Sequence, residues 1–189
     1  NSPLDYEILG QTIDDAVGEA FDKCSKMMGL GYPGGPKIDK VSKEGNPDAI
    51  KFPRAKVEDA PYDFSFSGVK TNVINLIHKL KQNNEDVPVN DIAASFQFCV
   101  CDVLASRLIE VAKEEGVGDV CLAGGVAANS HLRAALEKMC KKRGICLCMP
   151  ERSLCGDNAA MIAAAGYYAF QKGIFANTSL NASASDDGL

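Results

Sequence analysis

Val120-Cys-Leu-Ala-Gly-Gly-Val-Ala-Ala-Asn129 is the stretch that decides the fold, because an apolar run ends there on two glycines and a helical pattern follows at once. The same order is repeated downstream. Strands are predicted over 119–122 and 145–148, and helices over 127–142 and 157–172. Strand–helix alternation of this kind is typical of an α/β sheet with crossover helices. We therefore expect an α/β fold, a mixed sheet flanked by helices.

The sequence before this stretch mixes both periodicities. Strands are predicted over 5–9 and 63–67, and helices over 13–28, 36–43, 68–82 and 90–115. Ser67 is a candidate N-cap for the helix that follows it. We expect one lobe over 1–175 and a flexible polar tail over 176–189, because the tail is poor in apolar residues.

Composition narrows the class of protein. The chain has 189 residues, 46% of them hydrophobic, and a net charge of −5, which argues against wrapping nucleic acid by bulk charge. Neither an apolar run of the ~18 residues that span a bilayer nor a secretory signal is recognisable, so we expect a cytoplasmic protein without membrane contact. The eight cysteines lie mostly in apolar runs, which favours buried free thiols over disulfides.

A row of acidic residues is the first candidate site. Asp15, Glu19 and Asp22 are spaced i, i+4, i+7 and would line one helix face, with Lys23 off that row. A solvated acidic face explains the charges alone. However, Gly18 lies within the predicted helix at a cost of about 0.8–1 kcal/mol relative to alanine, which a close ligand would explain. The helix also leads into Pro33-Gly34-Gly35-Pro36. A second interpretation is therefore that the acidic residues bind the ribose hydroxyls and one edge of a nucleotide.

Two further junctions carry candidate residues. Gly124 and Gly125 let a ligand approach a helix N-terminus that attracts phosphate, and Asn129 adds a polar group, although many α/β proteins use such a junction as a plain turn. Asp157 begins the last predicted helix, where it could be an N-cap, a hard oxygen ligand for a metal, or both. The isolated His78 and His131 do not suggest a metal pair.

Five motifs follow one another along the chain: Ile8–Lys23, Tyr32-Pro-Gly-Gly-Pro36, Asp63-Phe-Ser-Phe-Ser-Gly-Val-Lys-Thr71, Leu122-Ala-Gly-Gly-Val-Ala-Ala-Asn129 and Cys155-Gly-Asp-Asn158. In this order and spacing they resemble the TsaD family. The resemblance runs from about Tyr6 to about Gly173. It departs at Gln11, where the family commonly carries glutamate.

The resemblance implies an actin/Hsp70-like ATPase fold and transfer of a threonylcarbamoyl group from threonylcarbamoyl adenylate to N6 of the adenosine beside the tRNA anticodon. Asp22, Gly35 and Asn129 would bind the adenylate, supported by Asp15, Glu19, Gly34, Gly124 and Gly125. Asp157 would be one ligand of a catalytic iron or zinc. The implied ligands are the adenylate or ATP/ADP, and the implied partners are tRNA and the proteins TsaB and TsaE.

The family's His-x-x-x-His pair and Ser-Gly-Gly loop do not occur in this sequence, so no catalytic residue is assigned to it. We expect the chain alone to be inactive, to bind metal weakly or not at all, and to expose an incomplete sheet edge where it could self-associate. The alternatives are a metalloendopeptidase, the label that the family long carried, a sugar-kinase-like ATPase, and a non-catalytic interaction fragment.

Overall fold

The computed structural model describes residues 4–181, which divide into two compact units. The larger unit is residues 8–156, and the smaller one joins residues before position 8 to those from Asp157 onward. The larger unit contains α1 (Val17–Met27), α2 (Gly34–Val41), η1 (Ser42–Glu44), α3 (Ser67–Gln82), α4 (Val89–Glu114), β1 (Asp119–Cys121), η2 (Gly125–Ala128), α5 (Ser130–Arg143), β2 (Cys146–Cys148) and η3 (Arg152–Leu154).

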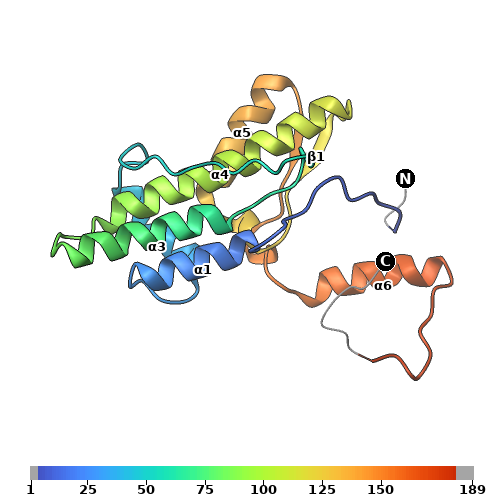
Figure 1. Cartoon of the computed structure of the whole chain (residues 1–189). Helices are drawn as coiled ribbons and strands as arrows, with labels where there is room; N and C mark the ends of the chain where they lie inside the picture. Colours follow the sequence, from blue (N-terminus) through green and yellow to red (C-terminus); the bar gives the residue numbers. More distant parts are fainter. Residues whose placement is uncertain (1–3, 182–189) are drawn as a thin grey trace. The chain divides into compact units, whose positions relative to one another are not determined.

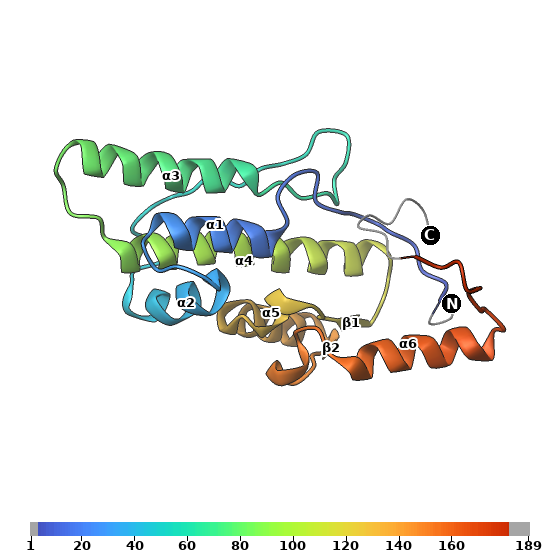
Figure 2. The same ribbon diagram turned by 90° about the horizontal axis from the view of Figure 1, so that it is seen from below.

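Helix α4 runs through the middle of the larger unit (Figures 1 and 2). Its first half packs against α1, α2 and α3, and Phe96 meets Phe21 of α1 edge to face at 5.0 Å between ring centroids. Its second half packs against α5 and β1, with Ile109 at 1% exposure. By length and composition α4 could cross a membrane, but 61% of its apolar window is buried inside the fold, as in a core helix.

The sheet is smaller than the sequence suggests. β1 and β2 pair in parallel, with Val120 opposite Leu147, and α5 lies between them along the chain, as the strand–helix pattern predicts. The strand predicted over 5–9 is wrong, and the one over 63–67 is reduced to a single bridge between Thr12 and Phe64. A strand needs a neighbour for its backbone groups, and the described residues place none beside 5–9.

Asp14 explains the cap of α3 and the late start of α1. Its Oδ1 accepts hydrogen bonds from the backbone N–H groups of Phe66 (2.8 Å) and Ser67 (3.2 Å), and its Oδ2 accepts from the hydroxyls of Ser65 and Ser67. Asp14 therefore caps α3 from a distant segment, whereas Ser67 was predicted to do so. Since Asp14 turns toward α3, α1 begins only at Val17, not at residue 13.

The smaller unit contains α6 (Ala159–Gln171). Asn158 caps it by accepting the Met161 N–H at 3.0 Å, so the prediction that Asp157 caps this helix is wrong. No α6 side chain is buried, and several large apolar ones are exposed, Ile162 and Phe170 among them. The predicted tail reaches residues 182–189, which lie outside the described residues.

Candidate functional site

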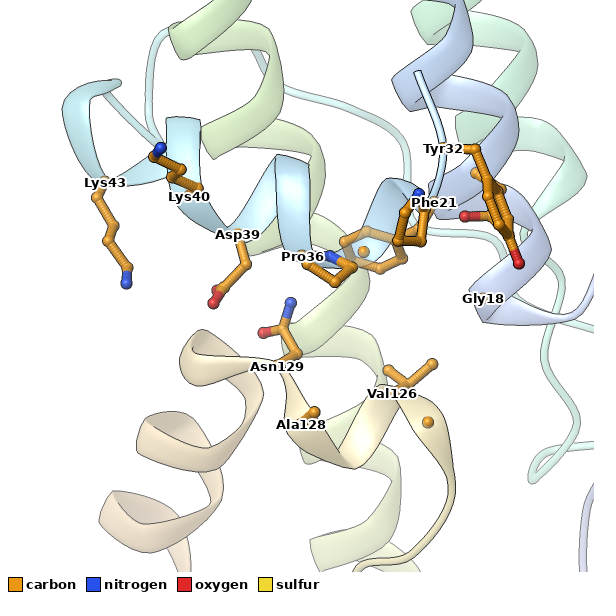
Figure 3. A pocket seen from close by; sticks show the side chains of 14 residues that line it. Gly18, Phe21, Tyr32, Pro36, Asp39, Lys40, Lys43, Val126, Ala128 and Asn129 are labelled. Carbon is orange, nitrogen blue, oxygen red and sulfur yellow. The ribbon is translucent and has the colours of Figure 1, made fainter. Parts of the chain in front are cut away.

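A cavity of about 570 Å³ opens between α1, α2 and the η2–α5 junction. Gly18, Phe21 and Asp22 form the α1 wall, and Figure 3 shows Tyr32 at its edge. Three residues face them from the other side: Val126, Ala128 and Asn129. Its volume lies in the ~300–1,000 Å³ range of small-molecule sites, and its lining is largely apolar with a few polar groups. The arrangement suits a ligand with a flat apolar part and several hydrogen-bonding atoms.

The two glycines of the Pro33–Pro36 turn have different roles. A Cβ on Gly34 would lie 2.5 Å from the backbone oxygen of Phe21, so only glycine lets α2 approach α1 this closely. The Gly34 N–H donates to Asp22 Oδ1 at 2.6 Å, which fixes that carboxylate beside the cavity. A Cβ on Gly35 would meet nothing within 4 Å, and Gly35 lines the cavity. Gly34 therefore builds the wall, and Gly35 leaves room at its surface.

The Gly124–Asn129 junction forms the opposite wall. Gly124 has φ +86°, a conformation that favours glycine, and Gly125 lines the cavity as η2 begins. Asn129 is 8% exposed and is the N-cap of α5, where its Oδ1 accepts the Leu132 N–H at 3.0 Å. The residue predicted to bind a ligand is thus also a helix cap.

Helix α2 contributes residues that the sequence analysis missed. Asp39 Oδ1 accepts from the Ser130 hydroxyl at 2.6 Å and from the Ser130 N–H at 3.3 Å, which joins the α2 wall to the start of α5. Lys40, and Lys43 of η1, also line the cavity (Figure 3). The i, i+4 spacing of Gly35 and Asp39, which places them along one face of α2, is the signal that could have found Asp39.

Asp15 and Glu19 do not line this cavity, which corrects the predicted acidic face. Asp15 precedes α1, and its Oδ1 lies 2.8 Å from Lys23 Nζ, while its Oδ2 pairs with Lys70. Hydrogen bonds from Lys23 and then Lys70 lower the Asp15 pKa. Glu19 lies 2.7 Å from the same Lys23. Both carboxylates are therefore ion-paired with lysines, and Asp22 is the only member of the predicted row that lines the cavity.

Comparison with known proteins decides the family. The family model described as TsaD, tRNA N6-adenosine threonylcarbamoyltransferase, matches residues 1–164. This chain belongs to the TsaD family. Curated relatives named tRNA N6-adenosine threonylcarbamoyltransferase are 52% identical in Clostridium botulinum strain 657 (178 residues), 51% in Clostridium beijerinckii (178 residues) and 52% in Clostridioides difficile (177 residues). Each alignment covers 94% of this chain and 52% of the relative, so the chain spans about half the length of those proteins.

Solved structures show a similar fold. HypF from T. kodakarensis superposes with a TM-score of 0.54 at 22% identity, covering 81% of this chain and 20% of HypF. A full-length HypF, described as its phosphate- and nucleotide-bound form, gives 0.55 at 15% identity and covers 75% of this chain and 18% of that one. At this identity the likeness concerns the fold alone, a helix-rich α/β arrangement.

The residues that the structure describes do not by themselves supply the donors for the metal that the TsaD resemblance implies. Among residues 4–181, no group of three or more His, Cys, Asp or Glu side chains could hold a metal ion. Asp157 is exposed in the smaller unit and offers one carboxylate. A catalytic zinc usually needs three protein ligands. The described residues therefore do not form a metal centre, and no chemical step is assigned to one.

Proposed function

We propose that this chain supplies the nucleotide-binding part of a tRNA N6-adenosine threonylcarbamoyltransferase with an actin/Hsp70-like ATPase fold. The observation that carries the proposal is that Asp22, Gly35 and Asn129, far apart in the sequence, line one cavity together with Gly125. Family membership supports the reaction class, and the nucleotide-bound HypF with a similar fold supports the ligand class. The ligand would be threonylcarbamoyl adenylate, or ATP or ADP.

The cavity would bind and orient the adenylate rather than perform the transfer. Asp22, held by the Gly34 N–H, offers carboxylate oxygens to ribose hydroxyls, while Gly35 lets the nucleoside approach the α2 backbone. Asn129 would contact the ligand from the opposite wall. In the transfer, N6 of the tRNA adenosine attacks the carbamoyl carbon, the bond from that carbon to the phosphate oxygen breaks, AMP leaves, and N6 loses a proton.

The remaining assignments are proposals that rest on the family. The partners would be tRNA and the proteins TsaB and TsaE, and the compartment would be the cytoplasm. Asp157 would contribute one ligand to an iron or zinc centre whose other ligands lie outside the described residues. None of these is needed for the binding test below.

Binding of AMP and ADP to the 189-residue chain, measured by calorimetry, tests the nucleotide site. Asp22→Asn keeps an oxygen for the Gly34 N–H but removes the charge, and we expect at least roughly tenfold weaker binding, the loss of one charge-assisted hydrogen bond. Glu137→Ala changes an exposed residue of α5 away from the cavity and should bind as the wild type does. Equal affinity of all three proteins would contradict the site.

The transfer reaction is tested in cells. When the endogenous protein is depleted, complementation with a full-length protein that carries the wild-type sequence should restore threonylcarbamoyladenosine in tRNA, measured by nucleoside mass spectrometry, whereas the same protein with Asp22→Ala or Asp157→Ala should not. Unchanged modification with both variants would overturn the proposed reaction even if nucleotide binding were demonstrated.

A further inference from the structure

A series of hydrogen-bonded side chains connects the cavity to the middle of α4. Gln97, 3% exposed on α4, accepts a hydrogen bond on Oε1 from Asn129 Nδ2 at 2.8 Å. Its own Nε2 donates to Ser42 Oγ at 2.8 Å, and Ser42 Oγ donates to the backbone oxygen of Asp39 at 3.1 Å. Gln97 does not line this cavity, so any effect that it has on a ligand there must pass through Asn129.

Each end of this hydrogen-bonded series is a backbone group that can act only as a donor or only as an acceptor. At one end the Leu132 N–H can only donate, so the Asn129 atom 3.0 Å away must be its oxygen, Oδ1. At the other end the Asp39 carbonyl can only accept, so Ser42 must donate to it and accept from Gln97. Because the series begins at a backbone donor and ends at a backbone acceptor, only one direction of donation lets every hydrogen bond in it form. The side-chain amides of Asn129 and Gln97 therefore have one preferred orientation each.

The consequence for the cavity follows from counting donors and acceptors on Asn129. Its Oδ1 accepts from Leu132 N–H and from Cys101 Sγ at 3.5 Å, and one Nδ2 hydrogen is given to Gln97. The amide has one more hydrogen, on Nδ2. Figure 3 shows the Asn129 nitrogen directed toward α2 across the cavity. The side chain therefore presents a donor, not an acceptor, to a ligand.

We propose that Gln97 is a positioning residue that locks the Asn129 amide with a donor facing the cavity, so that the site selects a ligand with an acceptor atom at that point. The proposal rests on the proposed function, because it takes this cavity as the nucleotide site. Without the Gln97 acceptor, a buried Asn129 N–H would lose its partner, and the amide would turn or shift to find another.

Three variants separate positioning from folding. Gln97→Met keeps an unbranched side chain of similar size without the amide, whereas Gln97→Glu keeps an oxygen that accepts from Asn129 whether or not the carboxyl is protonated. Ser95→Ala is the matched control. Ser95 lies on the same helix at 1% exposure and makes two hydrogen bonds, to Ile50 N–H and Asn46 O at 3.2 Å each, away from the cavity.

Calorimetric titration with AMP gives the first measurement. We expect Gln97→Met to bind roughly tenfold more weakly, the equivalent of one net hydrogen bond. Ser95→Ala should stay within about twofold of wild type even if it melts earlier, whereas Gln97→Glu, which places a buried carboxyl near an anionic ligand, serves only the ligand-free measurement. Adding Asn129→Asp, which keeps the α5 cap and removes Nδ2, should abolish any further effect of Gln97→Met. Equal AMP affinity of wild type and folded Gln97→Met would overturn the proposal.

A ligand-free measurement distinguishes this proposal from the one on which it rests. In NMR spectra, solvent exchange of the Asn129 side-chain N–H, assigned by its loss in Asn129→Asp, should be at least roughly tenfold faster in Gln97→Met and unchanged in Gln97→Glu. If wild type binds no AMP, the proposed function fails and this exchange rate alone decides the orientation. Two results would contradict the positioning role. One is an Asn129 N–H exchange rate in Gln97→Met equal to that of wild type. The other is a folded Gln97→Glu in which this N–H exchanges as fast as it does in Gln97→Met.

Discussion

Adjacent glycines in one turn have opposite requirements in this chain, which gives a sharp residue-scale test. Gly34→Ala places a Cβ 2.5 Å from the Phe21 backbone oxygen and should cost about 1–3 kcal/mol of unfolding free energy, as overpacking does. Gly35→Ala meets no atom within 4 Å and lies in a helix, so stability should hold or rise by up to ~1 kcal/mol, while AMP affinity falls. Thermal melts and calorimetry on both variants check this; equal melting temperatures would contradict it.

The site residues show what sequence can predict at this scale. Asp22, Gly35, Gly125 and Asn129 were predicted and do line one cavity, because turns and helix starts leave local marks in the sequence. Asp15 does not line the cavity and pairs with two lysines, Lys23 and Lys70, of which Lys70 lies 55 positions away on another helix. Partners of that kind depend on tertiary packing, which a single sequence does not reveal.

At the scale of elements, the cap of α3 offers a pH-dependent test. Burial raises the Asp14 pKa, but hydrogen bonds from Ser65, Ser67 and the Phe66 N–H outweigh it and lower the pKa from 3.8 to about 2. Since the folded-state pKa lies below the unfolded one, the stabilisation is complete above about pH 4 and is lost as the pH falls through about 2. Asp14→Ala should therefore destabilise by about 0.5–2 kcal/mol at pH 7 and hardly at all near pH 2.

Asp14→Asn is the matched control, since it keeps an acceptor oxygen but does not titrate. The denaturant midpoint of Asp14→Asn minus that of Asp14→Ala should be independent of pH between 2 and 7. The midpoint of wild type minus that of Asp14→Ala should shrink on acidification. A wild-type advantage that persisted undiminished at pH 2 would show that Asp14 is not the titrating cap.

The helices and strands also show why the ends of an element are harder to predict than its presence and type. The helices over 90–115 and 68–82 were predicted within a residue or two, because their apolar spacing is long and regular. The start of α1 was wrong by four residues, since Thr12 and Asp14 bond to the distant Phe64–Ser67 segment instead of continuing the helix. The strand over 5–9 failed for a related reason, since strands form by pairing and local alternation does not supply the neighbour.

For the whole larger unit, thiol reactivity reports the fold in a single experiment. All eight cysteines are free, and five are buried: Cys24, Cys99, Cys101, Cys140 and Cys155. The other three, Cys121, Cys146 and Cys148, are exposed on β1 and β2, where the sequence suggested burial because apolar neighbours surround them. Side-chain alternation explains the difference, since positions i and i+2 of a strand share a face.

Native alkylation with iodoacetamide at pH 8, followed by peptide mass spectrometry, should therefore label the three strand cysteines first. Burial raises the pKa of Cys24 and of Cys101 to about 12, so these thiols are both inaccessible and protonated at pH 8, and they should react at least roughly tenfold more slowly. In guanidinium chloride all eight should react at similar rates. Fast labelling of Cys24 in the native chain would mean that α1 does not pack into its core as described, and fast labelling of Cys101 that α4 does not pack against α5, because these contacts exclude the reagent.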